Sequence, residues 1–239
     1  MLEAGDRVAV GVSGGKDSRT LLALLLQGVD IPPGDTDTQK QAQSDALPPD
    51  ENPPATRPYD IVAVHIDGSR VGLPDQRPVL EPWFQELGVA YEITPLLVPE
   101  GEALPMKCFR CTWNRRKALF FAADRLECNK VAMGHHADDA AVTTLMSLMY
   151  KGQLETLQPS LNFFDGRFIV IRPLIYLTAS EIARYARKRG WQFPPELECP
   201  RLETARRVHI ERFLRSLSNK EYKQIRTNLW RAAREVMGF

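Results

Sequence analysis

Residues 8–26 read VAVGVSGGKDSRTLLALLL, and this segment constrains the fold more than any other part of the chain. Residues 8–12 have the β-branched, alternating composition of a buried strand, and residues 18–26 contain strong helix formers with no helix breaker. Residues 13–17 therefore form a strand-to-helix turn. Glycines let the backbone of such a turn approach a ligand closely, and the helix that follows directs free N–H groups and the positive end of its dipole into it. The segment predicts a phosphate-binding site.

Strand-like and helical patterns alternate along the rest of the chain. The predicted strands are residues 8–12, 59–67, 90–98 and 130–136, and the predicted helices are residues 18–26, 78–87, 111–126 and 138–150. This alternation is typical of an α/β fold, in which a parallel sheet carries helices on both faces and ligands bind at the carboxyl ends of the strands. The predicted phosphate-binding turn lies at such an end.

The chain is long enough for one large core with a small appended element, because it has 239 residues of which 44% are hydrophobic. We assign residues 1–195 to one domain and residues 196–239 to a C-terminal basic helical tail. Residues 28–58 are rich in Pro, Asp, Gln and Thr and contain almost no large apolar residues. This composition predicts a flexible insertion in the first crossover connection.

The tail is basic, although the whole chain carries a net charge of only +1. Residues 184–239 contain 14 lysines and arginines against 6 acids. Residues 206–236 predict one or two amphipathic helices, whose apolar face includes Ile210, Phe213, Leu214 and Leu217. A solvated helix face is the plainer interpretation of such a segment. A charge asymmetry of this size nevertheless favours contact with the phosphate backbone of a nucleic acid.

The sequence also indicates a cellular setting. It has no apolar run long enough to cross a bilayer, and its N-terminal residues lack a signal-peptide pattern. Its four cysteines do not form the dense pattern of a secreted disulfide scaffold. We therefore expect a cytoplasmic protein with no membrane partner, in which cysteines serve a metal or redox function.

The string SGGKDS at residues 13–18 lacks the Gly-xxxx-Gly-Lys-Ser/Thr spacing of a Walker A loop. It resembles the PP-loop of the ATP pyrophosphatase superfamily, which has an adenine nucleotide alpha hydrolase-like fold and cleaves ATP to AMP and pyrophosphate while adenylating a substrate. The resemblance implies that Lys16 neutralises the phosphates as a point charge and that Asp17 helps to hold Mg²⁺. It also implies that pyrophosphate oxygens are held by Ser13, Gly14, Gly15 and Ser18.

Cys108 and Cys111 form a CxxC motif just before a predicted helix, and Cys199 stands far downstream. A CxxC motif alone fits half a zinc site, a redox pair or two ligands of an iron–sulfur cluster. A closed zinc site needs a fourth ligand, for which the candidates are Cys128 and His209. The position of Cys128 between a helix and a strand favours a small buried hydrophobic residue instead.

Five segments together resemble the tRNA 2-thiocytidine synthetase family, and the resemblance covers nearly the whole chain outside residues 28–58. They are the phosphate-binding turn, the strand that ends in HID, the block CFRCTWNRRKALFFAADRLECNKVAMGHHADD, the segment RPLIYLTASEIARYA and the late single cysteine. In that family three cysteines hold a 4Fe-4S cluster and leave one iron free to carry the sulfur that is transferred. The resemblance implies that these ligands are Cys108, Cys111 and Cys199.

The implied activity is an ATP-dependent tRNA thiolation. The carbonyl oxygen of a pyrimidine base, which we expect to be cytidine, attacks the α-phosphorus of ATP; pyrophosphate leaves, and sulfur then replaces AMP. The implied cofactors are ATP, Mg²⁺ and the 4Fe-4S cluster. The implied partners are tRNA and a sulfur donor, such as a cysteine desulfurase or free sulfide, and a homodimer is among the assemblies that we expect.

The string GHHADD at residues 134–139 follows a strand and enters a helix. The resemblance implies that Asp138 lies near the ATP phosphates or Mg²⁺ and that the two histidines shape the site, and we also expect Gly134 to contact the nucleotide. Two histidines beside two acids also fit a separate metal site. Asp139 fits a second role, because an acid stabilises a helix N-terminus.

Two further residues follow predicted strands. Asp67 resembles a family acid in the active-site cleft, although an Asp before Gly68 also fits a turn. Arg172 could hold a phosphate or a carboxylate.

Two other functions fit parts of the sequence. A related adenylating ligase of the lysidine type would join an amine to its substrate and would need no cluster. A nucleotide-binding regulator would hold ATP without turnover and would use the cysteines in a structural zinc site.

Overall fold

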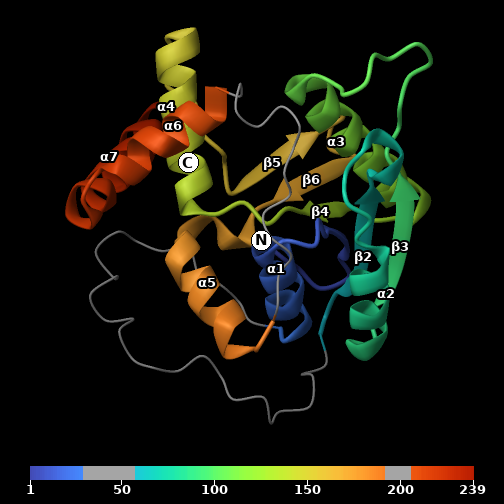
Figure 1. Ribbon diagram of the computed structural model, residues 1–239. Coiled ribbons are helices and arrows are strands. Elements are labelled where there is room, and N and C mark those ends of the chain that lie inside the picture. Colours follow the sequence, from blue (N-terminus) through green and yellow to red (C-terminus); the bar gives the residue numbers. More distant parts are fainter. Residues whose placement is uncertain (29–56, 192–205) are drawn as a thin grey trace.

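The computed structural model describes residues 1–28, 57–191 and 206–239 (Figure 1). Most of the predicted insertion at residues 28–58 and the predicted boundary between residues 195 and 196 lie outside the described residues, as does Cys199.

Six strands form one sheet in the order β3-β2-β1-β4-β6-β5. Their bounds are β1 (Arg7–Gly11), β2 (Asp60–Asp67), β3 (Ala90–Pro95), β4 (Lys130–Ala132), β5 (Ser160–Phe163) and β6 (Phe168–Ile171). All neighbours pair in parallel except β5, which runs antiparallel to β6 at the edge. The predicted parallel sheet is confirmed, and the β5–β6 hairpin extends it by an antiparallel edge strand.

The helices in the described ranges follow the predicted alternation and then continue beyond it. Their bounds are α1 (Lys16–Leu26), α2 (Arg77–Glu86), α3 (Cys108–Arg125), α4 (Ala137–Lys151), α5 (Ala179–Lys188), α6 (Arg206–Ser216) and α7 (Asn219–Met237), with short 3-10 helices η2 (Ser69–Val71) and η3 (Pro173–Tyr176). No helix of the described residues combines the length and apolar character needed to cross a membrane.

Side-chain alternation along β1 divides the core between the two faces of the sheet. Val8 and Val10 lie in one cluster with the leucines of α1 and with residues of α2 and α5. Ala9 lies in the other cluster, where Leu119 and Phe120 of α3 cover the sheet. Because strand residues alternate between faces, one short apolar strand supports both layers of helices. The predicted helices on both faces are thereby confirmed.

The C-terminal residues form two helices, α6 and α7, which gather beside α4 in Figure 1. Ile210 and Leu214 are buried against Val142 of α4. Ser218 begins α7 with a capping box, because its hydroxyl accepts the N–H of Glu221 while the Glu221 carboxylate accepts the N–H of Ser218. Ile210, Leu214 and Leu217 of the predicted apolar face pack in the cluster with α4, whereas Phe213 is 52% exposed and that part of the prediction is wrong.

A buried ion pair joins the amino ends of the central strands β1 and β4. Lys130 Nζ lies 2.7 Å from Asp6 Oδ2, and both side chains are almost fully buried. The N–H of Glu3 and the side-chain amide of Asn129 also donate to the Asp6 carboxylate. Burial raises the pKa of Asp6, but these donors and the Lys130 charge outweigh it and hold the pKa below its ordinary value.

Replacing Lys130 with Met should destabilise the protein strongly at neutral pH. The change leaves the buried Asp6 carboxylate without its cation, so urea unfolding should show a loss of about 3–5 kcal/mol. The loss should shrink as the pH falls toward about 4, near the pKa of Asp in an unfolded chain. In the variant, the unpaired Asp6 carboxylate becomes protonated as the pH falls, which removes the cost of burying its charge. In the wild type, the stability that the lowered pKa of Asp6 provides is lost only at still lower pH.

Lys151→Met is the matched control, because the Lys151–Glu155 ion pair is exposed and such pairs contribute about 1 kcal/mol or less. Equal losses in the two variants would contradict the structural role given to the Lys130–Asp6 pair.

Candidate active site

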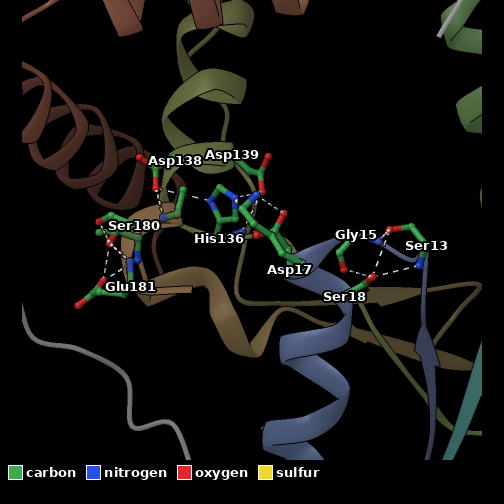
Figure 2. Close-up of polar contacts among 12 residues, drawn as sticks. Ser13, Gly15, Asp17, Ser18, His136, Asp138, Asp139, Ser180 and Glu181 are labelled. Carbon is green, nitrogen blue, oxygen red and sulfur yellow. Dashed lines mark hydrogen bonds and ion pairs between the residues drawn. The ribbon is translucent and has the colours of Figure 1, made fainter. Parts of the chain in front are cut away.

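The predicted phosphate-binding turn is closed by its own serines (Figure 2). The Ser18 hydroxyl accepts the N–H of Ser13 at 3.1 Å and donates to the carbonyl of Gly15 at 3.0 Å. Gly14 has a φ of +91°, and a Cβ at this position would lie 2.7 Å from Gln76 Oε1. The turn therefore needs glycine at position 14, and its shape is set before any ligand binds.

The charged residues of the turn follow directly. Lys16 and Asp17 begin α1, and Lys16 Nζ lies 3.2 Å from Asp17 Oδ2. Asp17 Oδ1 is buried and accepts no hydrogen bond within the described residues. The first turn of α1 thus presents an ammonium group, a carboxylate oxygen and the positive end of a helix dipole, a combination suited to a phosphate and its metal ion.

Gly134 brings the end of β4 against the beginning of α1. A Cβ at Gly134 would lie 3.1 Å from the backbone N and Cα of Ser18 and 3.2 Å from the carbonyl carbon of Asp17. Backbone atoms cannot move aside as a flexible side chain can. The predicted nucleotide-binding glycine therefore has a packing role as well as a place in the wall of the cavity described next.

A cavity of about 380 Å³ opens at the carboxyl ends of β1, β2 and β4. One wall is the phosphate-binding turn, and a second is the segment from Gly134 to Asp139. The third wall is α3, which contributes Thr112, Arg115, Arg116 and Leu119. The cavity lies where ligands of parallel sheets bind.

Arginines gather on the α3 side of the cavity, where Arg115 and Arg116 line the wall and Arg172 lies close enough to Arg116 to be influenced by its charge. The guanidinium of Arg172 is buried, donates to the Gln158 carbonyl and leaves its Nε without a hydrogen-bond partner in the described residues. Burial, with the nearby charge of Arg116, lowers the pKa of Arg172 to about 10. Burial also lowers the pKa of His135 to about 4, so its imidazole is neutral at pH 7. An anion is the ligand that best compensates this charge.

His136 joins the phosphate-binding turn to the acids of α4, as Figure 2 shows. Its Nε2 lies 3.8 Å from Asp17 Oδ1 and 3.4 Å from Asp139 Oδ2, and its Nδ1 lies 3.6 Å from Asp138 Oδ2. Asp139 also accepts the N–H of His136, which confirms the helix-start role considered for this acid. Asp139 lines the cavity.

Asp138 is held by hydrogen bonds from two other helices. Its carboxylate accepts the N–H of Ala179 at 2.7 Å, the hydroxyl of Tyr222 at 2.5 Å and a guanidinium N–H of Arg226 at 3.1 Å. Burial raises the pKa of Asp138, but these donors outweigh it and lower the pKa overall. Asp138 is not among the residues that line the cavity; it ties α4 to α5 and α7.

Asp67 also turns to local partners. Its carboxylate accepts the N–H of Ser69 at 2.8 Å and the Ser69 hydroxyl at 3.0 Å. These contacts close the turn after β2, the alternative that the sequence left open. Val64 and Ile66 of the same strand line the cavity instead.

The CxxC motif lies in the first turn of α3 rather than before it. Cys108 is exposed and Cys111 is half-buried. The helix begins earlier than predicted because Lys107, with an extended backbone, serves as its N-cap. Within the described residues no three His, Cys, Asp or Glu side chains form a group that could hold a metal ion, so neither the histidine–acid metal site nor a closed zinc site is found there.

Cys128 is fully buried in the core, and burial raises the pKa of its thiol. His209 is exposed on α6. The interpretation of Cys128 as a small hydrophobic residue is confirmed.

Two parts of the site were not predicted from the sequence. Arg115 and Arg116 line the cavity wall. They lie about one helical turn beyond Cys111 on α3, and this spacing was a signal that the sequence already contained. Tyr222 and Arg226 reach Asp138 from more than 80 residues away, and no local pattern indicates such a contact.

Comparison with known proteins decides the family. The chain is 34% identical over 245 residues to a tRNA-cytidine(32) 2-sulfurtransferase of Anaeromyxobacter sp. (strain K), and the match covers 99% of this chain and 74% of the relative. The chain belongs to the tRNA-cytidine(32) 2-sulfurtransferase family. Another member, from Variovorax paradoxus (strain S110), is 33% identical, with coverage of 99% of this chain and 70% of the relative. The resemblance based on the sequence motifs is thereby confirmed.

The fold of this sulfurtransferase family member is also similar to a solved structure, the U34-tRNA thiolase NcsA from Methanococcus maripaludis with its 4Fe-4S cluster. The TM-score is 0.69, the sequence identity is 20%, and the match covers 99% of this chain and 73% of that one. This likeness supports the α/β fold assigned from the sequence. No protein-family model matches the chain.

Replacing Lys16 with Ala should weaken ATP binding. A charge-assisted hydrogen bond contributes about 1.5–3 kcal/mol, so calorimetry should show a loss of roughly 10- to 100-fold in affinity. The far-UV circular dichroism spectrum should not change, because the Lys16 side chain is 35% exposed and forms its ion pair with the neighbouring Asp17. Lys188→Ala, at an exposed position on α5, is the control and should bind ATP as the wild type does. Normal ATP affinity in Lys16→Ala would remove the phosphate-binding role of the turn.

Proposed function

We propose that the protein is an ATP-dependent tRNA thiolase that adenylates the C2 carbonyl of a cytidine and replaces its oxygen with sulfur. Family membership supports the reaction, since the curated relatives are named for the sulfurtransfer to tRNA cytidine 32. One observation on this chain carries the proposal: α3 presents the CxxC motif in its first turn and a wall of the phosphate-binding cavity from Thr112 onward.

The phosphate-binding turn holds the β- and γ-phosphates of ATP in this account. Backbone N–H groups at the start of α1 donate to the phosphate oxygens, and Lys16 supplies a compensating charge. Asp17 Oδ1, which accepts no hydrogen bond in the described residues, is our candidate ligand for Mg²⁺. The Ser18 hydroxyl keeps the turn in shape, because it accepts the N–H of Ser13 and donates to the carbonyl of Gly15.

The α-phosphate then lies on the side of the cavity formed by α3, where Arg115 and Arg116 stabilise charge. The target carbonyl oxygen attacks the α-phosphorus and pyrophosphate leaves, which converts a poor leaving oxygen into AMP. A carbon–sulfur bond forms as the carbon–oxygen bond to AMP breaks. The guanidinium groups of α3 stabilise the departing phosphate in the same position.

Cys108 and Cys111 fit two ligands of a 4Fe-4S cluster. The two cysteines are three residues apart in the first turn of α3, a spacing that places both on the same side of the helix. We assign the third ligand to Cys199, which lies outside the described residues. When bound, the cluster supplies an iron without a protein ligand at which sulfur can be held.

Asp138 and Asp67 act on this site indirectly in our proposal. Asp138 positions His136 and the start of α4 while it accepts hydrogen bonds from α5 and α7. Asp67 fixes the turn after β2. Neither carboxylate is among the groups that line the cavity, because each is hydrogen-bonded to partners outside it.

The proposed partners follow from the reaction. The substrate is tRNA, the sulfur comes from free sulfide or a cysteine desulfurase, and the reducing cytoplasm suits both the cluster and the RNA. A homodimer stays a proposal.

The two alternative functions fit the site less well. A lysidine-type ligase would not need a CxxC motif on the helix that lines the cavity, and a regulator would not need an adenylation site beside that motif.

Single Ser substitutions at Cys108, Cys111 or Cys199 should each remove the visible absorbance of the anaerobically purified protein and its thiolation of tRNA. Thiolate ligands are what holds such a cluster. ATP should bind to all three variants, because the phosphate-binding turn is separate from the CxxC motif. Absorbance spectra, iron and sulfide analysis and nucleoside mass spectrometry measure these outcomes.

Cys128→Ala is the matched control and should keep both the absorbance and the activity. Ala avoids the buried hydroxyl that Ser would introduce in the core. A cluster that survives the loss of Cys199 but not of Cys128 would overturn the proposed ligand set, and a zinc-containing colourless protein would support the regulator instead.

A second prediction concerns the tail, where the structure separates two kinds of arginine. Arg207 and Arg226 pair with the site acids Asp139 and Asp138, whereas Arg212 and Arg215 are exposed and have no acidic partner in the described residues. Reversing the last two to Glu should weaken tRNA binding and lower the slope of log affinity against log salt by about 0.9 for each phosphate that the variant no longer binds. ATP affinity should not change.

The control for the tail has the same change of net charge at another site. Arg187 and Lys188 are exposed near the end of α5, and their reversal to Glu should leave tRNA affinity closer to the wild-type value. Equal effects of the two double reversals would mean that net charge, and not the tail surface, decides RNA affinity.

A further inference from the structure

Three large aromatic side chains are exposed along one face of α3. The exposed fractions are 77% for Phe109, 57% for Trp113 and 53% for Phe121. Together with Lys117, which is also exposed, they are spaced four residues apart and so follow one another along the helix. We call Phe109, Trp113, Lys117 and Phe121 the α3 stripe.

The members of the α3 stripe contact one another. The rings of Phe109 and Trp113 are stacked, with centroids 6.5 Å apart and planes that differ by 20°. Lys117 Nζ lies 5.5 Å from the centroid of the Phe121 ring. The rings therefore present apolar surface to solvent in a defined arrangement, although α3 already covers the sheet with its opposite face.

The α3 stripe borders the proposed active site. Phe109 lies between the two cysteines of the CxxC motif, and Trp113 follows Thr112 in the cavity wall. In Figure 1, α3 lies to the right of β5 and β6, and the group of α4, α6 and α7 lies to their left. The cavity lies between α3 and the start of α4, which supply two of its walls.

The surface around the α3 stripe is positively charged. The residues of α3 include five Arg or Lys and one Asp. Arg110 and Arg125 are paired with Glu102 and Glu92, but Arg115, Arg116 and Lys117 have no acidic partner in the part of the chain that the structure describes. Aromatic rings among uncompensated cations form the combination that binds unpaired nucleotides, since bases stack on the rings and phosphates meet the cations.

We propose that the α3 stripe is the platform on which unpaired bases next to the target cytidine stack. The inference rests on the proposed function, because it assumes an RNA substrate. Chemistry at a cytidine C2 carbonyl requires a base that has left its pair, since the C2 oxygen accepts a hydrogen bond in a G·C pair. Stacking of neighbouring bases on Trp113 and Phe121 holds that loop open beside the cavity.

A second copy of the chain is the other occupant of an exposed aromatic face. The unpaired charges of Arg115, Arg116 and Lys117 oppose it, because the same charges would face one another across a two-fold contact of this surface. An RNA loop brings negative charge to the same place. Charge complementarity therefore favours RNA.

The test replaces both Trp113 and Phe121 and leaves the CxxC motif intact. The double variant Trp113→Leu/Phe121→Leu (the Leu pair) keeps apolar surface without rings. The double variant Trp113→Tyr/Phe121→Tyr (the Tyr pair) keeps the rings. In filter binding of a tRNA transcript with cytidine at position 32, the Leu pair should bind on the order of 10-fold more weakly, whereas the Tyr pair should bind nearly as well as the wild type. The salt slope of the Leu pair should not change, because the cations that meet the phosphates are all kept.

A duplex RNA of equal phosphate number is the control ligand, and both variants should bind it as the wild type does. The proposal is overturned if the Leu pair binds the tRNA normally, if the Leu and Tyr pairs lose equal affinity, or if the salt slope falls. It is also overturned if sedimentation shows a wild-type dimer that the Leu and Tyr substitutions disrupt.

These outcomes separate the α3 stripe from the proposed function. Wild-type protein that thiolates tRNA, together with a Leu pair of normal affinity, rejects the stripe alone. Wild-type protein that neither binds nor thiolates the tRNA rejects both.

Discussion

The contact between Gly134 and the first turn of α1 is the constraint on which the site depends. A Cβ at position 134 would lie 3.1–3.2 Å from backbone atoms of Asp17 and Ser18, so a side chain there would push the end of β4 and the start of α1 apart by a few tenths of an ångström. The close approach places His136 between Asp17 and the acids at the start of α4. The phosphate-binding turn and the N-terminus of α4 consequently form two walls of one cavity.

The remaining wall explains how two distant motifs serve one reaction. α3 covers the sheet through Leu119 and Phe120, lines the cavity through Arg115 and Arg116, and carries the CxxC motif in its first turn. A single rigid helix thus fixes the distance between the proposed sulfur-transfer chemistry and the proposed adenylation site. The C-terminal helices add to this frame, because Tyr222 and Arg226 hold the Asp138 carboxylate while the outer face of the tail stays basic.

Much of this arrangement could be predicted from local sequence. The strand, turn and helix of residues 8–26 follow from apolar periodicity and glycine placement. The alternation of strands and helices along the chain indicated a parallel sheet. A strand before Arg172 was expected, but its antiparallel partner β5 was missed because β5 is exposed at the sheet edge and shows little apolar alternation. The start of α3 was placed three residues too late, since the first turn of a helix has no apolar face to reveal it.

The site residues divide in the same way. The phosphate-binding turn was found because its residues are contiguous, and Arg115 and Arg116 were missed although their distance from the CxxC motif is about one helical turn. The setting of Asp138 could not be predicted, because its partners Tyr222 and Arg226 are joined to it by tertiary packing of α7 on α4. Spacing along the chain does not report contacts of that kind.

An isotope measurement tests the central claim, that adenylation and sulfur transfer occur at one carbon in one site. The tRNA would carry ¹⁸O at the C2 carbonyl of the target cytidine, and the cluster-loaded protein would receive it with ATP and sulfide under anaerobic conditions. Mass spectrometry should find the ¹⁸O in the phosphate of AMP, in equal amount to the thiolated nucleoside formed. Release of the label into water, with none in AMP, would contradict the account.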